Sequence, residues 1–201
     1  MFKNSKSLMP TVMLVTANIA VYAFTSLLSG NLMVMDDAVL AYYGQMNIRV
    51  LNGWYWQLLT SMFVHVNIVH IAGNMFFLII FGLKAEEIFG VEEYLIVYFL
   101  SGLAGNFLTL LYLGPYTISA GASGAIFGMF GAVLIYQRRV VRQSIGSALI
   151  YAFFMLILSV GLNVNILAHL GGLGVGLLLG YGFAAMRKPP PMTEYRYSYT
   201  T

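Results

Sequence analysis

Two stretches of 44 residues, 94–137 and 143–186, contain no Asp, Glu, Lys or Arg, and they constrain the fold of this chain more than any other feature. Two further uncharged stretches, 7–35 and 50–83, have 29 and 34 residues. Of the 201 residues, 60% are hydrophobic and only 8% are charged, whereas about a quarter of a soluble domain is charged. Such a chain cannot cover a water-facing surface, so the expected solvent is a lipid bilayer.

The lengths of these stretches predict six membrane-spanning helices. A spanning helix needs about 20 residues, so 7–35 and 50–83 supply one helix each. A helix of 44 residues would be about 66 Å long, twice the ~30 Å hydrocarbon core, so each longer stretch must fold back once. We expect the breaks at Gly114-Pro115 and near Gly161–Asn165. The fold class is therefore an all-α polytopic membrane protein. We expect one domain over 1–187 with spans at approximately 8–28, 61–81, 92–113, 121–137, 143–161 and 166–186, and a flexible tail over 188–201.

The distribution of positive charge predicts which helix ends face the cytoplasm. An even number of spans puts both termini on one side, together with nine of the ten Lys and Arg residues, and leaves only Arg49 on the other side. Because positively charged loops stay cytoplasmic, we expect both termini in the cytoplasm. The small size of the chain and its simple six-helix core favour a prokaryotic plasma membrane. The nine residues are Lys3, Lys6, Lys84, Arg138, Arg139, Arg142, Arg187, Lys188 and Arg196.

Charge and cysteine content exclude several other classes of protein. The net charge is only +3, far too small for a groove that follows nucleic-acid phosphates. The chain has no cysteine, which removes disulfides, thiolate nucleophiles and cysteine-bound metals. We therefore expect that the protein binds no nucleic acid. Its expected partner is the lipid bilayer that surrounds it.

Five polar residues from three predicted spans lie at one depth, in the outer half of the membrane. His65, His70 and Asn74 fall in the outer half of the second span, Ser123 in the first turn of the fourth, and His169 about one turn into the sixth. Polar residues are costly inside a membrane and are functional candidates. Taken singly, a serine between glycines is more often a packing site, and a lone buried histidine is usually a hydrogen-bonded structural residue.

Taken together, these residues favour a serine nucleophile activated by a histidine base. A serine hydroxyl is a weak nucleophile until a neighbouring base accepts its proton, and His169 is the only base in the fourth to sixth spans. Small residues spaced by four, Gly124 with Gly128 and Gly172 with Gly176, predict close contact between the fourth and sixth spans. Both aspartates lie in the first outer loop, so a Ser–His dyad is expected rather than a triad.

An acyl transfer also needs hydrogen-bond donors for the negative oxygen of its intermediate. His70 and Asn74 are four residues apart, about 40° around a helix, so they share a face. The backbone N–H of Ser123, at the start of a helix, is a further donor without an intrahelical partner. His65 precedes His70 by five residues, about 140° around a helix, so we expect it to point elsewhere and to be structural.

This combination of residues resembles the rhomboid intramembrane serine proteases across essentially all six predicted spans. No single piece is specific, but the set is. The matching pieces are Trp56 in the first loop, His65-x4-His70-x3-Asn74, Glu86 and Gly90 after it, Gly121-Ala122-Ser123-Gly124, and Ala168-His169-Leu170-Gly171-Gly172-x3-Gly176.

The resemblance implies a role for each candidate residue. Ser123 would be the nucleophile and His169 the general base and acid. The family cleaves transmembrane protein substrates in or near their helices, commonly at small residues, and uses no cofactor or metal. The implied oxyanion donors are His70, Asn74 and the Ser123 backbone amide, and the implied supporting residues are Gly121, Gly124, Phe127 and Gly172.

Two positions depart from the family pattern. Trp56 is followed by Gln57, where such rhomboids commonly have Trp-Arg, and this weakens any inference about how the first loop is anchored. Phe127 stands where tyrosine is frequent. A phenylalanine ring can still stack beneath His169 and stabilise its protonated form. We therefore expect an active enzyme whose base is slightly less constrained than usual.

Three other functions stay open. A transporter or channel could use the histidines as a proton or metal path, although the polar residues stop halfway across the membrane. A metalloprotease is disfavoured because His65 and His70 are five residues apart and no HExxH motif is present. A proteolytically inactive relative that binds membrane proteins is disfavoured because every bond-making group is present.

Overall fold

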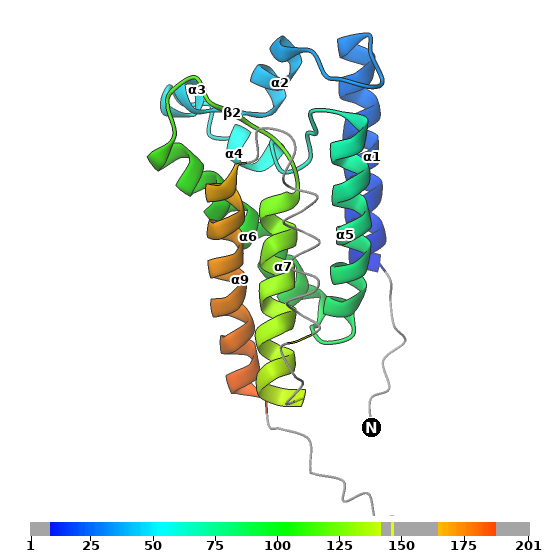
Figure 1. The fold of residues 1–201 in the computed structure, drawn as a ribbon, viewed down its shortest axis with the longest axis vertical. Coiled ribbons are helices and arrows are strands. Elements are labelled where there is room, and N and C mark those ends of the chain that lie inside the picture. The colour runs from blue at the N-terminus through cyan, green and yellow to red at the C-terminus, as the bar shows by residue number, and fades with distance from the viewer. Residues whose placement is uncertain (1–8, 142–145, 147–164, 188–201) are drawn as a thin grey trace, which may run out of the picture.

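The computed structural model describes residues 9–141, 146 and 165–187, and this part of the chain is mostly helical (Figure 1). The predicted span 143–161 and the tail 188–201 lie outside the described residues. The elements are α1 (Met9–Ser29), α2 (Asp37–Tyr43), β1 (Gln45–Met46), α3 (Asn47–Leu51), α4 (Gln57–Thr60), α5 (Ile68–Glu86), α6 (Val91–Tyr112), β2 (Ile118–Ser119), α7 (Ser123–Tyr136), the π-helix η1 (Gln137–Val141) and α9 (Ile166–Met186).

Within the described residues, four helices are long and apolar enough to cross a membrane. They are α1, α5, α6 and α9, each with a stretch of 19–22 residues. Helix α7 has 14 residues and continues directly into η1. The structure therefore has the all-α membrane class that the uncharged stretches predict.

The start of the second predicted span is wrong by seven residues. The expected range was 61–81, whereas α5 begins at Ile68 and ends at Glu86. Asn67 has an extended backbone, and its side-chain oxygen accepts the His70 amide at 2.7 Å, which caps the helix. Counting uncharged residues locates an apolar stretch but not a helix cap inside it. Residues 61–67 therefore belong to the uncharged stretch but not to the helix.

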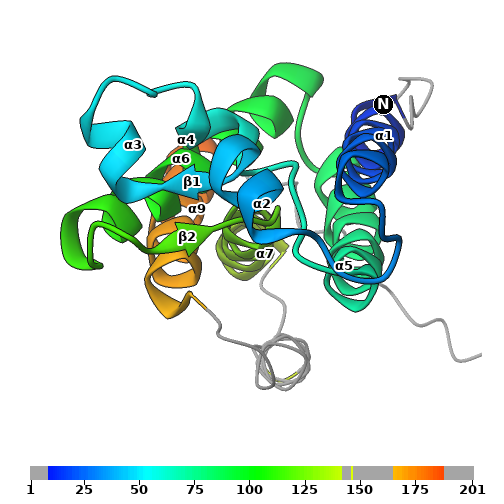
Figure 2. The ribbon, with the colours of Figure 1, turned by 90° about the horizontal axis from the view of Figure 1, so that it is seen from above.

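Helices α6, α7 and α9 pack with almost no side chain between their backbones. A Cβ atom at Gly172 or Gly176 of α9 would overlap the carbonyl groups of Gly124 or Gly128 of α7, respectively. In α6, Gly105 lies in the same way against the backbone of Ala168. Small residues permit this close approach, and dispersion contacts between the backbones replace the absent side chains. Seen from above, α7 lies between α9 and α5, and α1 packs beside α5 (Figure 2).

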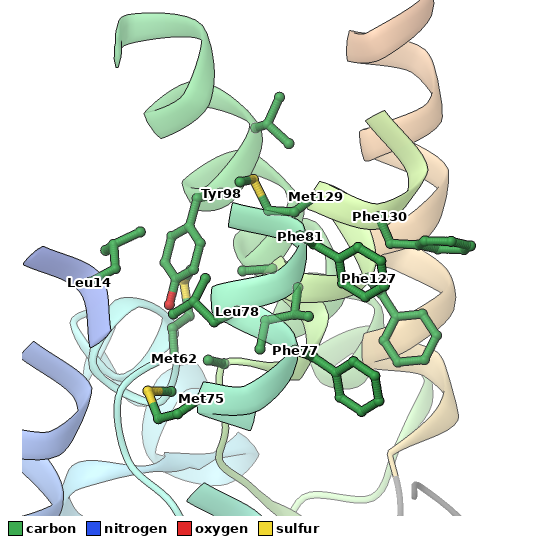
Figure 3. Close-up of a cluster of buried hydrophobic side chains, with 14 of the residues drawn as sticks. Leu14, Met62, Met75, Phe77, Leu78, Phe81, Tyr98, Phe127, Met129 and Phe130 are labelled. Atoms are coloured by element: carbon green, nitrogen blue, oxygen red, sulfur yellow. The ribbon is translucent and has the colours of Figure 1, made fainter. Parts of the chain in front are cut away.

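Helices α5 and α7 are joined by a cluster of aromatic rings (Figure 3). Phe81 and Phe130 have ring centroids 5.2 Å apart, and Phe77 stacks on Phe81 at 5.9 Å. Tyr94 and Tyr98 of α6 are fully buried beside this cluster. The helix that begins at Ser123 is thus held by glycine contacts on one side and by large rings on the other.

The segment between α1 and α5 is folded against the helix bundle at the end where α5, α7 and α9 begin (Figure 1). Its strand β1 pairs antiparallel with β2, with Gln45 opposite Ser119. Four of its aromatic side chains, Tyr42, Tyr43, Trp54 and Trp56, form one group, in which Trp54 and Trp56 stack at 5.5 Å. Strand β2 leads directly to Ser123, so this pairing positions the segment before the serine.

Gln57 anchors this segment, which corrects the expectation that its departure from Trp-Arg leaves the anchoring in doubt. The side chain is fully buried. Its Nε2 donates to the carbonyls of Ala41 at 2.9 Å and Tyr42 at 2.8 Å, and its Oε1 accepts the Met46 amide at 3.0 Å. A neutral amide offers both donors and an acceptor, so one uncharged side chain binds three backbone groups of the loop, and Arg49 Nη1 adds a second donor to the Ala41 carbonyl at 2.8 Å.

Candidate active site

Ser123 and His169 lie within hydrogen-bond distance although they are 46 residues apart. Ser123 is the first residue of α7, and His169 lies one turn into α9. The His169 Nε2 is 2.8 Å from the Ser123 Oγ, and both residues are half-buried. The glycine contacts between α7 and α9 make this distance possible. A hydroxyl and an imidazole in this arrangement can transfer a proton.

The Phe127 ring holds the imidazole from one side. Its centroid is 4.2 Å from that of His169, and the two ring planes differ by 17°, which is a stacked arrangement. Phe127 is one helical turn beyond Ser123, so α7 supplies both the hydroxyl and the surface on which the imidazole rests. Stacking of this kind contributes about 0.5–1.5 kcal/mol beyond the area it buries.

If His169 is the general base that the sequence predicts, Phe127→Leu is expected to lower kcat for cleavage by about 3- to 10-fold, because the protonated imidazole loses its stacked ring. Phe127→Tyr retains a ring and is expected to lose less. Phe130→Leu is the matched control, since it removes a buried ring from the same helix at a position that packs against Phe81 and not against His169. Steady-state cleavage kinetics beside thermal unfolding would check this. Equal kcat losses in the two leucine variants would contradict the role of the Phe127 ring.

His70 and Asn74 border the backbone that leads to Ser123. Gly121 has φ +133°, and a Cβ built on it would lie 2.7 Å from His70 Cε1 and 3.9 Å from Asn74 Nδ2. The Gly121 amide donates to the Ser61 carbonyl at 2.8 Å. Glycine is required here because other residues rarely adopt this φ and because the imidazole occupies the space of a side chain. The turn therefore brings the two α5 side chains beside the start of α7.

Asn74 is oriented by its own helix. Its Nδ2 donates to the His70 carbonyl at 2.9 Å, and the residue is buried. An amide nitrogen carries two hydrogens, so one remains for a ligand. The Ser123 amide is at the first helical position, where no intrahelical acceptor exists. These donors and the positive end of α7 form an environment suited to a negative oxygen.

The expectation that His65 points away from His70 is wrong. The centroids of the two rings are 5.2 Å apart at 65°. The angle of about 140° assumed one continuous helix, but His65 lies in the turn before α5. Its Nδ1 donates to the Phe63 carbonyl at 3.2 Å, and burial lowers the pKa of His65 to about 3. A neutral, fully buried ring fits a structural role beside His70.

Comparison with known proteins decides the family. A model of the rhomboid domain matches residues 52–186. The putative rhomboid protease YdcA of Bacillus subtilis is 32% identical over 186 residues, which cover 90% of this chain and 92% of that protein. The chain belongs to the rhomboid family. It is an integral membrane protein of a family that includes proteases.

Other rhomboid proteins match a smaller part of their own length. RHOMBOID-like protein 6, mitochondrial, of Arabidopsis thaliana is 38% identical over 132 residues, 63% of this chain and 43% of that protein. The rhomboid protease GluP of Bacillus subtilis is 32% identical over 157 residues, 74% of this chain and 29% of that protein. The chain therefore spans less than half the length of these two relatives.

The structural roles of two polar residues, Asn165 and Gln57, were not recognised from the sequence. Asn165 was regarded only as the end of a turn, and Gln57 only as a departure from the family pattern. Both are amides whose partners are distant in sequence, and no periodicity predicts such partners. An asparagine directly before a long apolar stretch is nevertheless a helix-capping signal, and this signal could have drawn attention to Asn165.

Proposed function

We propose that this rhomboid is an intramembrane serine endopeptidase in which Ser123 is the nucleophile and His169 the general base and acid. The observation that carries the proposal is the 2.8 Å distance between His169 Nε2 and Ser123 Oγ. The stacked Phe127 ring and the donors around Gly121 support it. The substrates are transmembrane segments of other membrane proteins, and no cofactor or metal takes part.

The reaction begins when Ser123 Oγ attacks the carbonyl carbon of the scissile peptide bond and its proton passes to His169 Nε2. The carbonyl oxygen becomes negative, and His70, Asn74 and the Ser123 amide donate hydrogen bonds to it. His169 then returns the proton to the leaving nitrogen as the C–N bond breaks, which leaves an ester on Ser123. Water, deprotonated by His169, hydrolyses this ester and restores the serine.

The topology that we propose is the one predicted from the sequence. We propose one membrane domain of six spanning helices over 1–187, with 188–201 as a tail. The protein lies in a prokaryotic plasma membrane with both termini in the cytoplasm, and its active site opens toward the exterior. The starts of α5, α7 and α9 all lie at the end of the bundle opposite the start of α1, which supports this arrangement (Figure 1). At that depth water reaches the acyl-enzyme without crossing the whole bilayer.

Purified enzyme reconstituted with a panel of transmembrane peptides tests the proposal. We expect cleavage within or beside the membrane segment, and none above background with Ser123→Ala, because no other group replaces the attacking oxygen. A matched Ser101→Ala variant changes a fully buried serine of α6 and controls for general loss of structure. Full cleavage by Ser123→Ala would overturn the proposal.

Asn74→Ala is expected to lower kcat by about 100-fold with little change in KM, because the amide acts on charge that exists only in the transition state. Asn18→Ala is the matched control, since Asn18 Nδ2 makes the same kind of bond within its own helix, to the Leu14 carbonyl at 2.8 Å. Steady-state kinetics on one transmembrane peptide measure both. An Asn74→Ala enzyme that loses no more kcat than the control would remove Asn74 from the oxyanion donors.

A further inference from the structure

Asn165 connects the helix that carries His169 to two other elements. It is the residue before α9, and its Oδ1 accepts the Ala168 amide at 3.1 Å, which caps the helix. Its Nδ2 donates to Thr109 Oγ1 of α6 at 2.6 Å and to Ser119 Oγ of β2 at 3.0 Å. Every polar atom of the side chain therefore has a partner, and the partners belong to three different elements.

The hydroxyl of Thr109 fixes the orientation of this amide. Thr109 Oγ1 donates its only hydrogen to the Gly105 carbonyl at 2.9 Å, so toward Asn165 it can only accept. The nitrogen of the Asn165 amide must then face Thr109, and its oxygen must face α9. If the amide were rotated by 180°, its nitrogen would face the Ala168 amide and its oxygen would face Thr109, and both hydrogen bonds would be lost.

The connections of Asn165 lead to both members of the Ser123–His169 pair. Its backbone carbonyl accepts the His169 amide at 3.3 Å in the first turn of α9. Ser119 lies four residues before Ser123, at the end of the strand that leads into α7. The Asn165 side chain thus links the first turn of α9, which carries the imidazole, to the segment that leads to the Ser123 hydroxyl. This link lies at the end of the bundle where the imidazole and the hydroxyl meet.

We propose that Asn165 is a positioning residue that sets the distance and alignment of His169 relative to Ser123. This inference rests on the proposed function of that pair. A helix cap alone needs only the Oδ1 atom, and serine or aspartate would supply it equally well. The two donations from Nδ2 add nothing to the cap, but they tie α9 to α6 and β2 across the site.

Cap-preserving variants separate positioning from simple stability. Asn165→Ser keeps a capping oxygen but does not reach Thr109 or Ser119. Asn165→Asp keeps the cap and places an oxygen against Thr109 Oγ1, whose hydrogen is already committed to Gly105. Thr109→Val removes the acceptor from the other side, and Thr109→Ser restores it. All four are made in the full chain, and each is assayed per folded molecule.

We expect Asn165→Ser and Thr109→Val to lower kcat by about 10- to 100-fold with KM within about twofold, because a small misplacement of reacting groups has effects of this size. The rate constant for phosphonylation by a fluorophosphonate probe is expected to fall in parallel. Thr109→Ser is expected to recover most of the loss. Asn165→Asp is expected to lose at least as much kcat as Asn165→Ser.

Two results would overturn the inference in distinguishable ways. Phosphonylation of wild-type Ser123 combined with unchanged kcat in Asn165→Ser would show that Asn165 is only a cap, and would leave the proposed function intact. A thermal midpoint that falls while the kcat of the folded fraction is unchanged would do the same. Absence of any phosphonylation of wild-type Ser123 would overturn the proposed function and the positioning role together.

Discussion

His169→Ala is expected to lower kcat for a transmembrane peptide by about 10,000-fold or more, because the hydroxyl of Ser123 then has no base to accept its proton. In the structure the imidazole is the group 2.8 Å from that hydroxyl, and its ring rests on Phe127. KM is expected to change little, since the imidazole acts in the chemical step. Cleavage is measured with peptide in excess over enzyme for hours, so that a rate this low is still detected.

The double variant Ser123→Ala/His169→Ala sharpens this prediction. Residues that act as one unit are strongly non-additive, so the double variant is expected to be no slower than either single variant. Multiplied losses would mean that the two residues contribute independently. A His169→Ala enzyme that retains a tenth of wild-type kcat would also contradict the pairing.

Gly172→Ala is expected to destabilise the protein by about 3 kcal/mol or more and to abolish cleavage. A methyl group there would overlap the carbonyl of Gly124, one residue beyond Ser123 in α7. Backbone cannot move aside as a flexible side chain does, so α7 and α9 must separate, and the hydroxyl and the imidazole separate with them. Thermal unfolding in detergent and cleavage kinetics measure the two effects.

Gly174→Ala is the matched control for this substitution. Gly174 lies in the same helix, and a methyl group there meets nothing within 4 Å. We expect unchanged kcat and stability equal to or slightly above that of the wild type, since alanine favours helix over glycine by up to about 1 kcal/mol. If Gly172→Ala behaved like this control, the close backbone contact of α7 and α9 would not support the site.

The long helices could be predicted from the sequence because the uncharged stretches are long enough to contain them. Helix α6 follows a turn and begins at Val91, one residue before the expected range, and α9 ends at Met186, directly before Arg187. The start of α5 could not be found in this way, because Asn67 interrupts an uncharged stretch by capping and not by charge. Local hydrogen bonds decide such boundaries, and hydropathy does not record them.

The candidate site was predictable where it depended on few residue types. Three histidines and one serine in a Gly-Ala-Ser-Gly motif leave few possible pairs in a charge-poor chain, and the glycine spacing indicates which helices approach. The amide contacts of Gln57 and Asn165 were not predictable, since their partners lie on elements that only the fold brings together. The position of His65 beside His70 was missed because a turn was treated as helix.

The pairing of Ser123 with His169 is tested most directly by phosphonylation of the reconstituted enzyme, with the modified residue located by mass spectrometry. We expect a single adduct on Ser123 in the native protein, none after heat denaturation, and a rate constant at least about 1,000-fold lower in His169→Ala. An adduct on another residue, or labelling of Ser123 at a rate independent of His169, would contradict it.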